Sequence, residues 1–326
     1  MTSGVELARA YSAEVVEPLL ARALPDVPLA SARLGSGWDV LGLDDETSQD
    51  HDWGLRLTVL VPDADVAEVD AVLEQGLPET WRELPTRFAT TWEPTVRQRA
   101  EVSSPLAFAH SRTGLTLDHD PTTVEWLSLT GQAVLEIVSG PVFRDDTGEL
   151  GTIRERLDWY PDDVWRFAQA ADWARIGEEL PFVGRTAERG DHAGSRVITA
   201  RIVRTTMHLA LLRARRWPPY SKWLGTAFAA LPDREAVGAP LIRALRADDW
   251  RERESALAEA LDALAGTTAT QPFFDRPYRG LADALLTDHR AIGTVEQWCD
   301  HVEVLTDADR RMAATRALFG PTWGAS

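Results

Sequence analysis

Hydrophobic and polar residues follow two different periods in the first third of the chain. Between residues 6 and 24, apolar side chains recur every three or four positions, which predicts an amphipathic helix that ends before Pro25. Residues 54–61 alternate apolar and polar positions, which predicts a strand with one well-buried face. The same two patterns predict a helix over residues 63–75 and strands over residues 28–34, 88–102 and 113–118. We therefore expect a small mixed β-sheet with flanking helices.

The pattern changes near residue 121, after which long helical stretches rich in Trp, Ala, Leu and Arg follow. Proline, which interrupts helices, divides these stretches at residues 161, 181, 218–219, 232 and 272. With 326 residues, the chain is also long for a single hydrophobic core. We therefore predict an α+β protein of two domains, with a mixed domain over residues 1–140 and an all-helical domain over residues 141–326.

The composition is that of an ordinary folded protein, with 44% hydrophobic and 26% charged residues, which excludes disorder as the default state. No run of about 18 uncharged apolar residues occurs, and the N-terminus carries Glu6 and Arg9. We therefore expect no membrane partner and no signal peptide, and a cytoplasmic protein. The single cysteine, Cys299, excludes an internal disulfide and a cysteine-based zinc site.

The charge balance narrows the class of ligand. A formal net charge of −17 repels phosphate backbones, so it disfavours a nucleic-acid partner and favours small ligands accompanied by cations. Of the 34 basic residues, Lys222 is the only lysine. Either this residue survived by chance in a chain that otherwise uses arginine, or its compact ammonium does something that arginine cannot do.

A short motif near the N-terminus suggests phosphate and metal chemistry. Gly35-Ser36 is followed, after thirteen residues, by Asp50-His51-Asp52 at the head of the predicted strand. Because side chains alternate faces along an extended segment, Asp50 and Asp52 point the same way, about 6.6 to 6.8 Å apart. Such carboxylates can hold Mg²⁺, and the small residues 35 and 36 let backbone N–H groups and a hydroxyl approach a triphosphate. Without this spacing, the two acids could equally be ordinary turn residues before the strand.

This motif resembles that of the nucleotidyltransferase superfamily, which includes kanamycin nucleotidyltransferase and DNA polymerase beta. Further stretches of the chain are similar to a largely uncharacterised two-domain family within that superfamily: residues 35–45, 184–195, 219–223 and 274–278. The resemblance implies a small mixed sheet that carries a metal site and a helical domain that closes over the nucleotide. The glycine-rich residues 184–195 could form a lid, or their charged side chains could make only surface salt bridges.

Members of the superfamily usually add a third carboxylate from a neighbouring strand. The predicted strand 113–118 offers Asp118, and Asp120 follows on the same face. We favour Asp118 as the metal ligand and catalytic residue, because Asp120 precedes Pro121 and is better explained as a helix N-cap. If neither reaches the metals, the third carboxylate is absent.

The resemblance implies a Mg²⁺-dependent nucleotidyltransferase that uses two metal ions. Asp50, Asp52 and Asp118 would hold the metals, Gly35 and Ser36 would cradle the triphosphate, and Tyr220, Ser221 and Lys222 would bind its distal phosphates. The enzyme would move a nucleoside monophosphate, with ATP as the expected donor, to a hydroxyl or phosphate of a small acceptor. The alternatives are a catalytically silent nucleotide-binding or regulatory module, and nucleotidyl transfer to tRNA or to a protein. The acceptor, the preferred base and the oligomeric state do not follow from the sequence.

Overall fold

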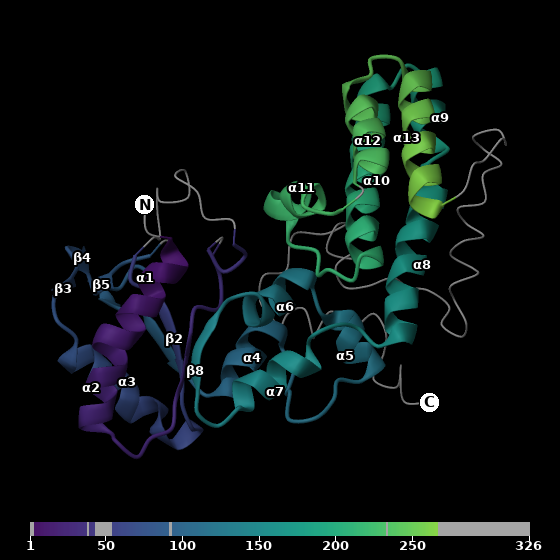
Figure 1. The fold of residues 1–326 in the computed structure, drawn as a ribbon. Coiled ribbons are helices and arrows are strands. Elements are labelled where there is room, and N and C mark those ends of the chain that lie inside the picture. The colour runs from purple at the N-terminus through teal and green to yellow at the C-terminus, as the bar shows by residue number, and fades with distance from the viewer. Residues whose placement is uncertain (1–2, 38, 43–53, 91–92, 233, 267–326) are drawn as a thin grey trace. The chain divides into compact units, whose positions relative to one another are not determined.

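Figure 1 presents the computed structural model of the chain, which describes residues 3–37, 39–42, 54–90, 93–232 and 234–266. These residues fall into two compact units. The first comprises residues 3–125 and Ala133–Asp158, and the second comprises Trp126–Gln132 and residues 159–266. In these ranges the first unit combines a small mixed sheet with helices and the second is helical. The predicted α+β class is confirmed.

The sheet of the first unit has four strands in the order β7-β2-β1-β8. Their bounds are β1 (Ala30–Ala32), β2 (Leu57–Leu60), β7 (Ala100–Ser103) and β8 (Val142–Asp145). β1 is antiparallel to both β2 and β8, whereas β2 and β7 are parallel. Every residue of β2 is buried, as expected for a strand that is covered on both faces. Because β1 runs against β2, the residues after β1 lie at the edge of the sheet where β2 and β7 begin.

The helix predicted over residues 6–24 forms as a helical run with a π-helical centre. It consists of α1 (Gly4–Tyr11), a π-helical turn (Ser12–Val16) and α2 (Glu17–Ala23). Ser3 and Glu6 form a capping box at its start, which satisfies backbone N–H groups that have no partner within the helix. Apolar side chains of this run share one hydrophobic core with alternate residues of β2 and with α3 (Val66–Gly76). The periodicity of the sequence therefore predicted this face of the unit correctly.

The remaining elements of the first unit are short. A 3₁₀ turn (Asp63–Asp65) leads into α3, and two small hairpins follow, formed by β3 (Thr80–Trp81) with β4 (Leu84–Pro85) and by β5 (Arg87–Phe88) with β6 (Arg97–Gln98). The helices are α4 (Pro105–Thr113), α5 (Thr123–Ser128), α6 (Gly131–Val138) and α7 (Glu149–Arg156). The last residues of α5 and the first residues of α6 fall within Trp126–Gln132, which belongs to the second unit.

The second unit is built around α10 (His192–Arg213), which packs against the other five helices of this region. They are α8 (Asp162–Glu179), α9 (Phe182–Glu188), α11 (Ser221–Ala229), α12 (Glu235–Arg246) and α13 (Trp250–Ala265). Prolines precede α8, α9 and α11, as the sequence predicts. Trp173, Leu209 and Leu257 are among the buried side chains of its core. Within the described ranges, no helix is long and apolar enough to cross a membrane.

Two acidic side chains are buried in the second unit. Asp172 Oδ2 lies 2.7 Å from His208 Nδ1, and both residues are buried. Glu254 on α13 is also buried, and its Oε1 has no hydrogen-bond partner among the described residues. Burial, reinforced by the charge of Glu188, raises the pKa of Glu254 to about 7, against the lowering effect of its hydrogen bond with the Gly184 backbone and the charge of Arg251. This carboxyl group therefore titrates near neutral pH.

The predicted strand over residues 113–118 is wrong. Ser104 accepts a hydrogen bond from the backbone N–H of Ala107, and Pro105 occupies the first turn, so a helix begins here and extends to Thr113. Gly114 then ends α4 in the left-handed conformation, with φ +75°. The residues that follow are turns and irregular backbone rather than a strand.

The range 141–326, which was predicted to be all-helical, contains the strand β8. This strand pairs with β1, and the first unit therefore extends to Asp158 instead of ending at the predicted boundary of 140. The glycine-rich residues 184–195, for which a lid was one of two alternatives, belong largely to α9 and α10. Gly184 is buried where a Cβ would lie 2.5 Å from Glu254 Oε1, so its role here is close helix packing.

Candidate nucleotide site

One edge of the sheet gathers three separate parts of the chain. β1 ends there and continues into Gly35 and Ser36, while β2 begins there after Gly54. β7, parallel to β2, also begins there and carries Glu101 as its second residue. The backbone N–H of Gly35 donates to the carbonyl of Glu136 at 2.7 Å, which fixes the turn against α6. Residues far apart in the sequence thus meet beside the turn at Gly35.

A buried ion pair braces this turn. The Arg33 side chain is 3% exposed, and its Nε and Nη2 donate to the two carboxylate oxygens of Asp39 at 2.7 and 2.9 Å. The same guanidinium donates to the carbonyl of Leu34 at 2.6 Å and to that of Ser36 at 3.2 Å. Such a paired fork is the stronger and more directional form of an arginine–carboxylate contact. Arg33 therefore binds both sides of the turn.

Two more arginines lie at the turn. Arg56 Nη2 donates to the Ser36 hydroxyl at 3.3 Å. On the other side, Arg112 Nη2 lies 2.6 Å from each carboxylate oxygen of Glu101, and Arg112 Nε lies 3.8 Å from Glu136. Gly35 has φ +81°, and a Cβ at this position would stand 3.2 Å from Arg112 Nη2 and 3.7 Å from Glu101 Oε2. A side chain at position 35 would therefore crowd Arg112, which glycine avoids.

The structure brings together only part of the predicted site. Gly35 and Ser36 lie at the sheet edge just described, whereas Asp50 and Asp52 are outside the described residues. Asp118 lies in a turn after α4, where its side chain is 60% exposed and its Oδ1 is 3.7 Å from His119. The strand from which Asp118 was expected to reach the metals is not formed, which removes the reason for choosing it.

The explanation of Asp120 as an N-cap is also wrong. Its side chain is 93% exposed, and its nearest charged partner is Arg156 at 3.5 Å. The helix begins at Thr123, and Thr122 and Glu125 form the reciprocal contacts of a capping box. Asp120 therefore lies two residues before the cap.

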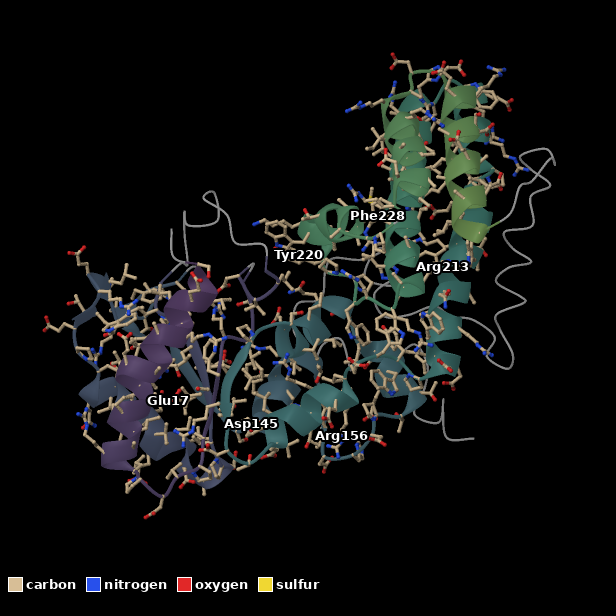
Figure 2. The ribbon with its side chains drawn as sticks, viewed as in Figure 1. Glu17, Asp145, Arg156, Arg213, Tyr220 and Phe228 are labelled. Carbon is tan, nitrogen blue, oxygen red and sulfur yellow. The ribbon has the colours of Figure 1, made fainter. Side chains whose placement is uncertain are left out.

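The three predicted phosphate ligands of the second unit lie together at the start of α11. Tyr220 is the residue before this helix, and its backbone N–H donates to Gln132 Oε1 at 3.4 Å. Figure 2 labels Tyr220 beside the start of α11, with Phe228 farther along the same helix. Ser221 and Lys222 form the first turn and are exposed, and Lys222 Nζ lies 5.1 Å from the centre of the Trp223 ring. Their part in binding phosphates stays a prediction.

The described residues around Gly35 include one carboxylate and two arginines, which are groups that can bind Mg²⁺ and phosphate. Among the described residues, no three His, Cys, Asp or Glu side chains gather as a metal site by themselves. Glu101 nevertheless supplies a hard oxygen ligand on the strand next to β2, the place that the resemblance assigns to a third carboxylate. Its Oε2 lies 3.7 Å from the point where a Cβ on Gly35 would stand. Glu101, rather than Asp118, is therefore the carboxylate that lies beside Gly35 among the described residues, and it is the candidate for a metal ligand there.

Sequence reasoning missed Glu101, Arg112 and Arg56. Glu101 lies within the strand that was predicted over residues 88–102, as an exposed acid between buried Ala100 and half-buried Val102. That alternation was the available signal, because it marks the face of the strand away from the core. Arg112 carried no such signal, since its position on a helix beside Glu101 depends on the tertiary structure.

Comparison with known proteins gives distant similarities. A family described as a domain of unknown function, DUF4037, matches residues 126–224, which is less than a third of the chain. No curated protein matches the chain. Among solved structures, the chain is similar to a nucleotidyltransferase-like protein from Exiguobacterium sibiricum 255-15, with a TM-score of 0.39 and 14% identity over 80% of this chain and 75% of that chain. So low a TM-score adds no support for a function. Any support for a function must therefore come from the residues of this chain.

Proposed function

We propose that this protein is a Mg²⁺-dependent nucleotidyltransferase. It would take a nucleoside triphosphate, with ATP as the first candidate, and transfer the nucleoside monophosphate to a hydroxyl or phosphate oxygen of a small acceptor. The acceptor oxygen forms a bond to the α-phosphorus, the bond between the α-phosphorus and the bridging oxygen to the β-phosphorus breaks, and pyrophosphate leaves. The acceptor's proton, where it has one, passes to a carboxylate or to solvent.

One observation supports this function above the others. The turn at Gly35 and Ser36, the start of β2 and Glu101 on β7 meet at a single edge of the sheet. In the sequence, the two acids of the motif, Asp50 and Asp52, precede β2, which begins at this edge with Leu57. The resemblance of the motif therefore coincides with a convergence of the elements that such a site needs.

Each group has a role in the proposed site. Asp50, Asp52 and Glu101 would hold two Mg²⁺ ions. When bound, these ions activate the attacking oxygen and neutralise the leaving pyrophosphate. Gly35 and Ser36 would let the triphosphate approach the backbone, and Arg56, which already contacts the Ser36 hydroxyl, would face the same phosphates. From the second unit, Tyr220, Ser221 and Lys222 would bind the distal phosphates.

Binding of the four nucleoside triphosphates, measured by calorimetry with and without Mg²⁺, tests the site. The variants Asp50→Asn, Asp52→Asn and Glu101→Gln should each lose metal-dependent binding or transfer of an α-labelled nucleotide while keeping the melting temperature of the wild type. Glu79→Gln is the matched control, because it removes an exposed acid of the same unit and should leave both binding and transfer unchanged. Asp118→Asn decides between the two candidates for the third carboxylate.

The outcomes separate the competing functions. Product that forms with small acceptors and is lost in Asp50→Asn and Asp52→Asn supports the proposal. Retained turnover in both variants contradicts it. Metal-dependent binding without product in any acceptor screen would instead favour a regulatory nucleotide-binding module. Product with tRNA or a protein, abolished by salt, would favour a macromolecular acceptor despite the net charge of −17.

A further inference from the structure

Arg112 lies at the place where the proposed reaction needs a metal ion beside Glu101 and a triphosphate beside Gly35. Its Nη2 is 2.6 Å from both oxygens of Glu101, the carboxylate that would hold a metal. The same atom is 3.2 Å from the point where a Cβ on Gly35 would stand, so the guanidinium covers this face of the turn. A triphosphate that approaches Gly35 would meet this guanidinium first, and a metal that approaches Glu101 would compete with it.

Arginine is well suited to phosphate. Its planar group presents several N–H donors, stays charged at every working pH and matches phosphate oxygens as well as it matches carboxylates. The group next to Gly35 is therefore a ready ligand for the anion that the turn is proposed to bind. Since Arg112 can satisfy either the phosphates or Glu101, the two contacts are alternatives for the same nitrogen.

We propose that Arg112 is a nucleotide-binding residue that pairs with Glu101 until a triphosphate arrives and then transfers to its phosphates. The transfer releases Glu101 for Mg²⁺, so the nucleotide and the metal assemble the site together. This inference rests on the proposed function, because it assigns a further ligand and an order of assembly to that same site.

The geometry of the pair favours such an exchange. Arg112 Nη2 contacts both oxygens of Glu101, whereas the buried Arg33–Asp39 pair uses two nitrogens in a fork. Glu101 is 46% exposed and Arg112 is 22% exposed, so water screens their attraction. The two residues can therefore separate at low cost.

The Arg112 side chain also has a fixed anchor. Its guanidinium carbon lies 4.9 Å from the centre of the Phe108 ring, one helical turn earlier on α4. Glu136 lies on the other side, 3.8 Å from Arg112 Nε, and keeps a negative charge near the guanidinium when Glu101 leaves it. The charged end can thus move between partners without leaving the site.

Two binding measurements on the full chain test this inference. Mn²⁺, as a probe for the metal, is titrated without nucleotide and followed by electron paramagnetic resonance. Inorganic tripolyphosphate is titrated in metal-free buffer by calorimetry. Arg112→Met, which keeps an apolar side chain over Phe108, should bind Mn²⁺ about twofold to fivefold more tightly because the competing cation is gone. It should bind tripolyphosphate about tenfold or more weakly because a charge-assisted contact is lost.

The opposite signs distinguish exchange from a structural role, since a damaged site would bind both probes more weakly. Arg97→Met is the matched control, because it removes an arginine from an exposed ion pair with Asp70 and should change neither affinity. If Arg112→Met fails to fold, Arg112→Lys serves in its place. It retains the charge and should keep a Mn²⁺ affinity near that of the wild type.

Several outcomes would overturn the inference. They are an unchanged or weaker Mn²⁺ affinity in Arg112→Met, an unchanged tripolyphosphate affinity, or a wild type that binds neither probe. Both probes binding as expected, with no nucleotidyl product from any acceptor, would leave the exchange supported and contradict only the proposed transfer.

Discussion

Removing Asp39 should destabilise the turn that carries Gly35 and Ser36. Asp39→Ala leaves the guanidinium of Arg33, which is 3% exposed, without its counter-charge. Breaking a buried pair by removing one partner costs about 3–5 kcal/mol, because the remaining charge stays buried. Since Arg33 keeps its hydrogen bonds to the carbonyls of Leu34 and Ser36, we expect the lower end, about 3 kcal/mol. Adding Arg33→Met should recover part of this loss, because the double variant buries no unpaired charge.

Amide hydrogen exchange followed by mass spectrometry measures this cost locally. A loss of about 3 kcal/mol should speed exchange through local opening about a hundredfold in peptides that cover β1 and the turn. Glu14→Gln is the control, because it breaks an exposed ion pair with Arg82 in the same unit and should cost less than about 1 kcal/mol. If Asp39→Ala protects β1 as well as Glu14→Gln does, Asp39 does not stabilise Arg33. If the double variant loses as much local stability as the two single variants lose together, the two residues are not coupled.

Three further predictions concern other positions. Because burial raises the pKa of Glu254 from 4.5 to about 7, its contribution to stability is fully present below about pH 4.5 and is lost as pH rises through 7. In urea unfolding, the free energy of unfolding of Glu254→Gln should therefore rise by up to about 3 kcal/mol relative to that of the wild type between pH 5 and 8. If the free energy of unfolding changed equally with pH in both proteins, the burial of a neutral acid would be contradicted. Gly131→Ala should lower the melting temperature of the second unit by several degrees, since its Cβ would collide with the Pro218 carbonyl oxygen. Gly225→Ala, with open space around it in α11, should instead raise the free energy of unfolding by about 0.5–1 kcal/mol. Similar melting temperatures of the two variants would show that α6 shifts freely to accommodate the new side chain. Gly35→Ala should lower the free energy of unfolding by about 1–2 kcal/mol, because alanine disfavours the φ of +81°, and it should also weaken tripolyphosphate binding. Melting curves measure the first effect and calorimetry the second, and an unchanged affinity for tripolyphosphate would contradict the prediction.

Local patterns predicted most of the fold where one pattern ran through a whole element. The first helical run and β2 formed as expected because their apolar residues keep one period over their full length. The strand prediction for residues 113–118 was wrong because the alternation of buried Thr113, Leu115 and Leu117 falls at the end of a helix that is capped by Gly114. β8 was missed because its sequence, Val-Phe-Arg-Asp, does not alternate apolar and polar residues, and pairing with β1 decides its conformation.

The candidate site follows the same division. Gly35 and Ser36 were predicted from a spacing within one stretch of sequence, and the structure places them at the edge where β2 begins. Glu101 and Arg112 come from a strand and a helix that reach this edge only in the folded chain. A third carboxylate could be chosen only after the neighbour of β2 was known, which is why the sequence favoured Asp118.

The position of β8 constrains the order in which the first unit can be completed during synthesis. A growing chain that has left the ribosome only as far as residue 140 contains β7, β2 and β1, but β1 then has no partner on its outer side. Such an open strand edge invites pairing with other chains. The segment Trp126–Gln132, which belongs to the second unit, must also emerge before β8 does. Neither unit is therefore one continuous stretch of the gene, and cutting the gene at codon 140 would yield a sheet that is ready to aggregate.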